Sequence, residues 1–374
     1  MDWTRVEQAI DEAARRGAFP GAVLLVSRKG EIVYHGAFGL RDLELERAPM
    51  HLEMIFDLSS LTKPLATTAA FLLMIADRRV RVEDRVTRFF PDFGVHGKSH
   101  VEFRHLLSHS SGLSAWRPYY RDIVKIDRRG RLNFICTEGA RQYVYQEIHR
   151  GRLEYPTGSR SLYSDLGFMV LGEFIEAIGG TSLDRFCTDR LFRPLGLRST
   201  SFIDLRALRL RKLEPVTEMI APTERCPWRK RVLCGEVHDD NAYAMGGVAG
   251  HAGLFSSARE VHALVNLWWE GYQGRSALFP RDLVRHFWTR DRSVPGSTWA
   301  LGWDTPAAQG SQAGSGFSER SVGHLGFSGT SIWIDIERQV HVILLTNRIH
   351  PSRDNDRIRE ERPRIHDLVM EVLK

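Results

Sequence analysis

The sequence predicts an α+β fold in which both ends of the chain build one antiparallel sheet. Apolar, β-branched runs at 21–27 and 31–39 flank a Gly-containing turn, a pattern typical of a β-hairpin. Similar runs at 329–336 and 340–346 lie near the other end of the chain. Longer apolar segments with helical periodicity occupy the middle of the sequence. We therefore expect helices to flank the sheet and a helical region to be inserted into it.

This order of segments predicts two parts that pack closely. Residues 1–58 and 245–374 are expected to form the sheet domain, and residues 59–244 the inserted, mainly helical domain. The chain has 374 residues and is 43% hydrophobic, which is enough to bury a core of that size.

Individual elements follow from the same patterns. The first 16 residues are typical of an amphipathic helix, and residues 60–78 and 164–178 of buried helices. The remaining expectations are helices at 101–108, 182–191, 258–270 and 356–373, and a further strand at 298–303. Residues 304–322 are rich in Gly and Ser, which predicts an exposed loop, either at the rim of an active site or elsewhere on the surface.

Composition excludes several classes of function. The net charge of +6 comes from basic residues spread along the chain, without a nucleic-acid-binding module, so we expect no nucleic acid partner. The N-terminus lacks the apolar core of a signal peptide, and the sequence shows no evident 18-residue apolar run. We expect no membrane segment and a cytoplasmic location for the chain as written; removal of a leader would instead indicate a periplasmic or secreted protein. The oligomeric state is left open.

Neither the cysteines nor the histidines suggest a metal site. The cysteines form no C-x-x-C pair, so free thiols are expected at Cys136, Cys187, Cys226 and Cys234. The fifteen histidines show no H-E-x-x-H or comparable spacing. We expect neither a metal nor another cofactor.

The quartet Ser60-Leu61-Thr62-Lys63 carries the main functional signal. A serine hydroxyl needs a neighbouring base to become a good nucleophile, and residues i and i+3 of a helix share one face. Pro64 is tolerated only in the first turn of a helix, so the helix should begin close to Ser60. Unpaired N–H groups at a helix start favour developing negative charge. This pattern predicts acyl transfer through a serine ester, with Ser60 favoured over Ser59 because only Ser60 has a lysine at i+3.

Further motifs follow in a recognisable order. They are His105-Leu-Leu-Ser-His109-Ser-Ser-Gly112, Tyr163-Ser164-Asp165 and Gly323-His324-Leu325-Gly326. In these motifs and in Ser60-x-x-Lys63, the sequence resembles the penicillin-recognising serine hydrolases over residues 20 to 350. These include class C β-lactamases, D-alanyl-D-alanine carboxypeptidases, D-aminopeptidases and related esterases. The resemblance implies the β-lactamase and penicillin-binding-protein transpeptidase-like fold, with the nucleophile in the cleft between the two parts.

The resemblance also implies roles for single residues. Tyr163 is expected to share proton transfer with Lys63, whose pKa must fall well below its reference value for it to act as a base. Asp165 stands where the family usually has Asn. Its carboxylate is expected either to hold Lys63 protonated or to recognise a cationic or donor-rich substrate.

The last motif and one glycine-rich segment supply further candidates. His324 is expected to donate a hydrogen bond to the substrate or to adjust the pair of Lys63 and Tyr163, and flanking glycines such as Gly326 suggest close substrate approach. The backbone N–H groups of Ser60 and Phe327 are the expected oxyanion hole. His238, ahead of the glycine-rich run 245–253, is expected to contact substrate or to support groups that do, and a purely structural role is the alternative.

Three kinds of activity fit this set of residues. The first is hydrolysis of a small ester, a D-amino-acid or peptidoglycan-derived peptide, or a β-lactam. The second is acyl transfer to an alcohol or amine, and the third is non-catalytic penicillin binding. Asp165 in place of Asn and His324 in place of Lys favour short-chain esters or small amides over β-lactams.

Overall fold

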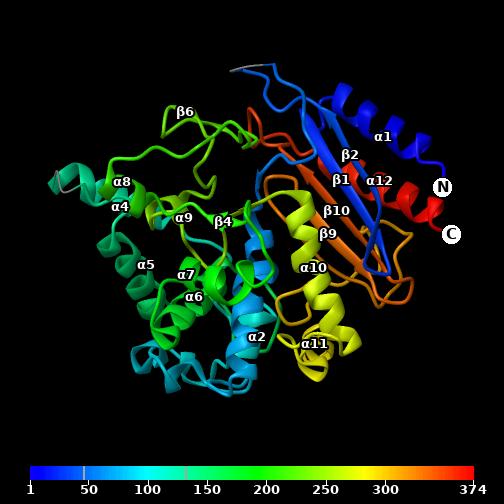
Figure 1. The fold of residues 1–374 in the computed structure, drawn as a ribbon. Coiled ribbons are helices and arrows are strands. Elements are labelled where there is room, and N and C mark those ends of the chain that lie inside the picture. Colours follow the sequence, from blue (N-terminus) through cyan, green and yellow to red (C-terminus); the bar gives the residue numbers. More distant parts are fainter. Residues whose placement is uncertain (45–46, 131–132) are drawn as a thin grey trace.

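The central element of the fold is a five-stranded antiparallel sheet with the order β2-β1-β10-β9-β8 (Figure 1). The computed structural model describes residues 1–44, 47–130 and 133–374. The strands are β1 (Gly21–Arg28), β2 (Glu31–Gly39), β8 (Val322–Leu325), β9 (Ser331–Asp335) and β10 (Val340–Thr346). β1 pairs with β10, with Ala22 opposite Thr346 and Arg28 opposite Val340. The prediction of one sheet built from both ends of the chain is therefore confirmed.

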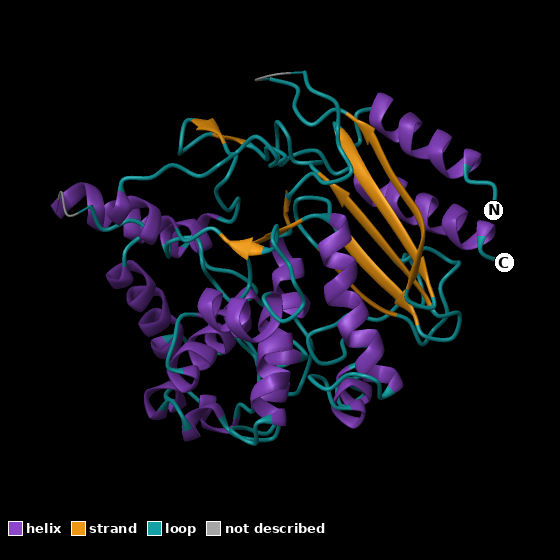
Figure 2. Cartoon of the chain, in the orientation of Figure 1, coloured by secondary structure: helices purple, strands orange, loops and turns teal. Residues whose placement is uncertain are grey.

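Helices cover both faces of this sheet. Helices α1 (Thr4–Arg15) and α12 (Ile358–Val372) lie side by side on one face, and α10 (Ala258–Gln273) packs on the other (Figures 1 and 2). Leu24 of β1 belongs to the core under α1 and α12, whereas Leu25 belongs to the core on the α10 side. Burial on both faces explains why β1 is a continuous apolar run instead of an alternating one.

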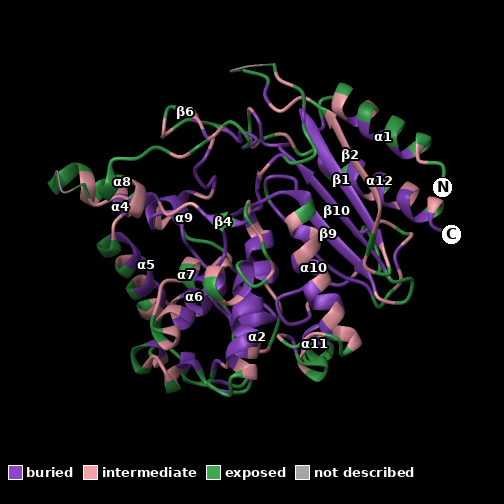
Figure 3. Ribbon diagram, viewed as in Figure 1, coloured by how far each residue is buried: buried purple, intermediate pink, exposed green. Residues whose placement is uncertain are grey.

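Most of the remaining helices form a second region around α6 (Asp165–Gly179), which is largely buried (Figure 3), whereas α11 (Arg281–Phe287) packs against α10. Ser164 caps the start of α6 by accepting a hydrogen bond from Gly167 N, and left-handed Gly180 ends the helix. Phe174 packs against the rings of Phe71 and Phe103. The other helices are α2 (Ala69–Ala76), α3 (Phe103–Leu107), α4 (Tyr119–Gly130), α5 (Glu138–Arg150), α7 (Leu183–Cys187), α8 (Leu205–Arg211), α9 (Asp240–Ala244) and α11 (Arg281–Phe287).

Two small sheets lie outside the five-stranded sheet. Strands β3 (Phe56–Asp57), β7 (Leu254–Ser256) and β4 (Ser201–Phe202) form one, and β5 (Arg225–Cys226) pairs with β6 (Arg231–Val232) in the other. β3 leads directly into the turn that carries Ser60, so its pairing with β7 fixes where that turn begins. The predicted domain boundaries stay a prediction.

Most element predictions are confirmed, but two are wrong. Residues 298–303 form no strand of the sheet, because Gly302 at φ 76° turns the chain back and Ala300 N bonds Trp303 O. The expectation that no apolar stretch of 18 residues exists also fails for Ser59–Ala76, which has the length and composition to cross a membrane. Of this stretch, 83% is buried inside the protein, as in a core helix.

Candidate active site

Ser60 and Lys63 lie next to each other at the start of the buried helix. Ser59–Leu61 form a 3-10 turn, and Lys63–Thr68 continue as a π-helical segment before α2. Such π turns are frequent at functional sites. Lys63 is completely buried, and its Nζ lies 3.1 Å from Ser60 Oγ and 3.0 Å from the carbonyl oxygen of His251. The lysine amine thus contacts the Ser60 hydroxyl, whereas the other hydroxyl of the motif, on Thr62, donates to Ser59 O.

The residue before Ser60 is held in an unusual backbone conformation. Ser59 has φ 48°, in the left-handed region that non-glycine residues rarely adopt. Its N–H donates to Asp57 Oδ1 at 2.8 Å, and its carbonyl accepts from Thr62 Oγ1 at 2.6 Å. Asp57 is buried, and burial raises its pKa. No sequence pattern indicated that Asp57 and Ser59 would shape this turn.

Tyr163 and Asp165 approach Lys63 from the start of α6. Asp165 Oδ1 lies 2.7 Å from Lys63 Nζ, and the Asp165 side chain is 17% exposed. The Tyr163 ring centroid lies 4.8 Å from the same Nζ. Ser164, between them, donates its hydroxyl to Ser114 O at 2.7 Å, which fixes the orientation of the segment. The structure therefore brings Ser60, Lys63, Tyr163 and Asp165 together around one buried amine.

The ion pair with Asp165 decides the charge of Lys63. Burial lowers the pKa of Lys63, but the carboxylate of Asp165, followed by Tyr163, more than offsets burial and holds the pKa above its usual range. Burial raises the pKa of Tyr163, although Lys63 opposes that change. At neutral pH, Lys63 is therefore a cation and Tyr163 a neutral phenol.

His324 on β8 is buried and neutral. Burial, assisted by the positive charge of Lys63, lowers its pKa to about 3. Its Nδ1 lies 2.8 Å from the Leu325 carbonyl oxygen, which requires the ring proton on Nδ1 and leaves Nε2 as an acceptor. Nε2 is buried without a hydrogen-bond partner, and the ring centroid lies 6.1 Å from that of Tyr163. In this tautomer neutral His324 offers an acceptor at Nε2, and its expected contact with substrate or with the pair of Lys63 and Tyr163 stays a prediction.

The turn after β8 is hydrogen-bonded onto the segment that carries Ser60. Ser328 N donates to Ser59 Oγ at 3.3 Å, and Ser328 Oγ donates to Asp57 O at 2.7 Å. A Cβ on Gly326 would lie 2.6 Å from Leu58 O. A side chain there would also collide with Thr330, so the protein's own packing already requires this glycine, and close approach of a substrate stays a prediction.

The two other predicted site residues of this region lie against each other. Phe327 is exposed, and the His238 ring stacks on it with centroids 5.6 Å apart. His238 is itself buried, and its ring Nε2 lies 2.9 Å from Glu224 Oε2. The backbone N–H of His238 donates to Asp57 Oδ2 at 2.7 Å. Its position beneath Phe327 fits a supporting role, and direct contact with substrate stays a prediction.

Two aromatic residues that the sequence did not assign to the site lie behind Tyr163. The His109 ring lies 4.6 Å from the Tyr163 ring and 4.3 Å from that of Trp299. His109 Nδ1 accepts from Ser164 N at 3.0 Å, and burial, with Lys63, holds its pKa well below the usual range. Trp299 also lies 5.6 Å from His324. These rings form an apolar backing that excludes water from the buried side of Tyr163.

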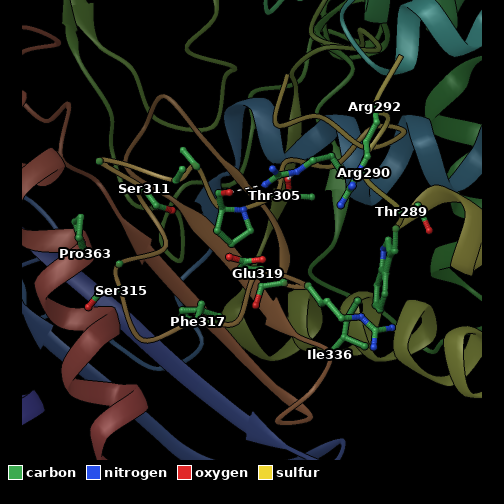
Figure 4. Close-up of a pocket in the computed structure, with 18 of the residues that line it drawn as sticks. Thr289, Arg290, Arg292, Thr305, Ser311, Ser315, Phe317, Glu319, Ile336 and Pro363 are labelled. Atoms are coloured by element: carbon green, nitrogen blue, oxygen red, sulfur yellow. Dashed lines mark hydrogen bonds between the residues drawn. The ribbon is translucent and has the colours of Figure 1, made fainter. Parts of the chain in front are cut away.

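The Gly- and Ser-rich loop lies elsewhere. Residues 305–321 line a cavity of about 1000 Å³, together with parts of α10, α11 and α12 (Figure 4). Arg290 spans one wall of this cavity and donates to Thr305 Oγ1 at 2.5 Å. None of the residues grouped around Lys63 lines the cavity, so the loop is not a rim of that cluster in this structure.

No metal site accompanies these groups in the described part of the chain. Residues 1–44, 47–130 and 133–374 contain no cluster of three or more His, Cys, Asp or Glu side chains that could hold an ion. The four cysteines are free thiols.

Comparison with known proteins agrees with this geometry. The β-lactamase family profile matches residues 6–364. The chain belongs to the β-lactamase family. Among relatives of this β-lactamase-family protein is an N-acetylmuramyl-L-alanine amidase of Bacillus subtilis (strain 168), 32% identical over 92% of this chain and 81% of the relative. A putative D-alanyl-D-alanine carboxypeptidase of Escherichia coli (strain K12) is 30% identical, over 89% of this chain and 79% of the relative.

Solved structures confirm the fold of this β-lactamase-family protein. An octameric penicillin-binding protein homologue from Pyrococcus abyssi has a TM-score of 0.70 at 21% identity, covering 93% of this chain and 74% of the homologue. EstCE1, a hydrolase with promiscuous acyltransferase activity, has a TM-score of 0.69 at 22% identity, covering 96% and 98% of the two chains. The predicted fold and family are therefore confirmed, and the protein is a serine hydrolase of this family.

Proposed function

We propose that this protein hydrolyses small amide bonds through an acyl-enzyme on Ser60. The observation that carries the proposal is the 3.1 Å contact between Ser60 Oγ and the buried amine of Lys63. In the proposed reaction, Lys63 first loses its proton to solvent. Ser60 Oγ then attacks the carbonyl carbon while its proton passes to the neutral Lys63 amine, with Tyr163 sharing the transfer. The same group returns a proton to the departing amine, and water then hydrolyses the ester.

The charge state of Lys63 favours an amine as the leaving group. An amine leaves only after its nitrogen is protonated, whereas an activated phenol leaves as an anion. The ion pair with Asp165 keeps a proton on Lys63, beside Tyr163 and Ser60. The same ion pair disfavours the neutral amine that Lys63 needs in order to act as a base. A hydrogen-bond donor of the substrate that engages Asp165 would weaken this ion pair and so assist the attack by Ser60.

The turn after β8 supports the proposed oxyanion hole. The backbone N–H groups of Ser60 and Phe327 are proposed to stabilise the developing oxyanion. Phe327 belongs to a turn that two hydrogen bonds of Ser328 attach to Ser59 and Asp57. A site fixed in this way requires little reorganisation as negative charge develops.

For the substrate, we propose peptides derived from the cell wall. Two relatives at 30–32% identity carry the names N-acetylmuramyl-L-alanine amidase and putative D-alanyl-D-alanine carboxypeptidase, and both names describe amide cleavage. Ester hydrolysis remains within the same chemistry. β-Lactams are ranked below both, because Asp165 is engaged by Lys63 and His324 lacks a proton on Nε2.

A fluorophosphonate probe and a substrate panel test the proposal. Intact mass should show one adduct, which Ser60→Ala abolishes and the exposed control Ser159→Ala retains. The panel consists of N-acetylmuramyl-L-alanine, a D-alanyl-D-alanine peptide, p-nitrophenyl acetate and nitrocefin. We expect kcat/KM for at least one of the two amides to exceed that for nitrocefin. Labelling of Ser60→Ala at the wild-type yield, or turnover of nitrocefin alone, would refute the proposal.

A further inference from the structure

In the described part of the chain, the exposed aromatic side chains lie on two segments that are hydrogen-bonded to residues around Ser60. Within residues 1–44, 47–130 and 133–374, only Trp116, at 43% exposure, and Phe327, at 48%, are both aromatic and exposed. All other Phe, Trp and Tyr side chains in these ranges are buried or partly buried. Exposed aromatic surface beside a reactive group is typical of ligand contact and not of the core.

A short series of contacts connects Trp116 to the nucleophile. The carbonyl oxygen of Ala115 accepts from Asp165 N at 2.9 Å. Asp165 Oδ1 in turn lies 2.7 Å from Lys63 Nζ, which lies 3.1 Å from Ser60 Oγ. Trp116 therefore directly follows a residue that is hydrogen-bonded to the catalytic cluster.

Trp116 is the exposed end of a row of rings, which we call the aromatic row and define as Trp116, Tyr120 and Trp228. The ring centroids of Trp116 and Tyr120 are 6.4 Å apart, and those of Tyr120 and Trp228 are 5.3 Å apart. Asn241 holds the backbone of this segment, since its side chain accepts from Tyr120 N at 3.0 Å and donates to Arg117 O at 2.8 Å. The row is thus ordered before any ligand binds, which limits the entropy lost on binding.

Phe327 differs from Trp116 because its ring already has two partners. The His238 ring stacks on it with an interplanar angle of 19°, and the guanidinium carbon of Arg348 lies 4.6 Å from its centroid. Arg348 Nε also donates to Phe327 O at 2.9 Å. A flat ligand group therefore finds exposed aromatic surface at Trp116, whereas the Phe327 ring is engaged by His238 and Arg348.

We propose that the aromatic row binds the sugar ring of an N-acetylmuramyl substrate, with Trp116 as the principal contact. A pyranose presents an apolar C–H face that packs on a flat ring, while its hydroxyl groups remain at the edge for polar neighbours. Arg117 and Glu154, which lie 3.4 Å apart and are both exposed, are polar groups beside Trp116. The inference rests on the proposed amide hydrolysis and specifies the substrate class of the same site.

Turnover of two matched substrates tests the inference. N-Acetylmuramyl-L-alanine and lactoyl-L-alanine contain the same scissile amide, and only the first has the sugar. We expect Trp116→Ala to reduce the preference for the sugar substrate about tenfold or more, as truncation of a well-packed tryptophan does, with little change for lactoyl-L-alanine. Trp116→Leu, which keeps apolar volume without a flat face, should behave in the same way. The control is Trp3→Ala, a partly buried tryptophan packed on Tyr34 between α1 and β2.

Equilibrium binding keeps the inference testable without turnover. The probe is N-acetylmuramic acid, titrated by calorimetry into Ser60→Ala and into Ser60→Ala combined with Trp116→Ala. We expect the second protein to bind about tenfold more weakly. Equal affinities, or no binding by the first protein, would overturn the inference. Absence of amide turnover with intact sugar binding would instead refute the proposed function alone.

Discussion

The ion pair between Asp165 and Lys63 predicts how acylation depends on pH. Asp165→Asn removes the negative charge 2.7 Å from the amine but keeps the shape of the side chain. With the carboxylate gone, burial is the main remaining influence on Lys63, and burial favours the neutral amine. The pKa of Lys63 should therefore fall, and a larger fraction of the enzyme should carry a free base at pH 7.

The size of the effect follows from the geometry of the pair. At 2.7 Å and an effective dielectric constant of 20, the Coulomb energy is about 6 kcal/mol, which is an upper bound because Asp165 is 17% exposed. Opposite charges at such distances shift a pKa by about 1–3 units, or about 1.4–4 kcal/mol. We expect the acylation profile of Asp165→Asn to move to lower pH by that amount.

The assay is the single-turnover rate of acylation by a p-nitrophenyl ester between pH 5 and 10. The midpoint belongs to the coupled group of Lys63 and Tyr163 and not to one residue. Asp122→Asn, which removes an exposed carboxylate 3.2 Å from Lys125, serves as the matched control and should leave the midpoint in place. An unchanged midpoint in Asp165→Asn, or one moved to higher pH, would refute the reasoning.

Two further predictions concern stability. Gly323→Ala should lower the free energy of unfolding by about 1–3 kcal/mol in a denaturant titration, because its Cβ would collide with the buried ring of Trp333. The control is Gly167→Ala, whose Cβ would meet only ordinary contacts. An equal loss of stability in both variants would contradict the argument. Burial lowers the pKa of His324 and of His366 to about 3, so between about pH 6.5 and 3 the unfolded chain binds protons that the native state does not. The contribution of the two histidines to the free energy of unfolding is thus fully present above pH 6.5 and is lost as the pH falls. The loss is roughly 1 kcal/mol per histidine between pH 6 and 5. A free energy of unfolding that stays constant over that interval would contradict the prediction.

The parts of the site that the sequence could predict are those that local patterns encode. The spacing of Ser60 and Lys63 predicted their contact because an interval of three residues recurs on one face of any helical turn. The hairpin of β1 and β2 was equally local, since its strands and its turn are contiguous. Their agreement with the structure shows how far short-range periodicity determines this fold.

The parts that the sequence missed depend on partners far along the chain. Trp299 lies in a segment that resembled a strand, but its place is decided by contact with the rings of His109 and Tyr163. The positive φ of Ser59 follows from hydrogen bonds that Asp57 and Ser328 make to it. Such contacts join positions up to 269 residues apart, and no periodic pattern records them.

The pairing of β1 with β10 has a consequence for biosynthesis. β1 (Gly21–Arg28) is synthesised long before its partner strand β10 (Val340–Thr346), so the sheet stays incomplete until Thr346 has left the ribosome. The turn at Ser328, which bonds the segment before Ser60, is synthesised equally late. A nascent chain therefore exposes its nucleophilic serine without the groups that complete the site around it. The hydrolase therefore acquires its reactive geometry only after the turn at Ser328 and strand β10 have been synthesised and have met the earlier segments.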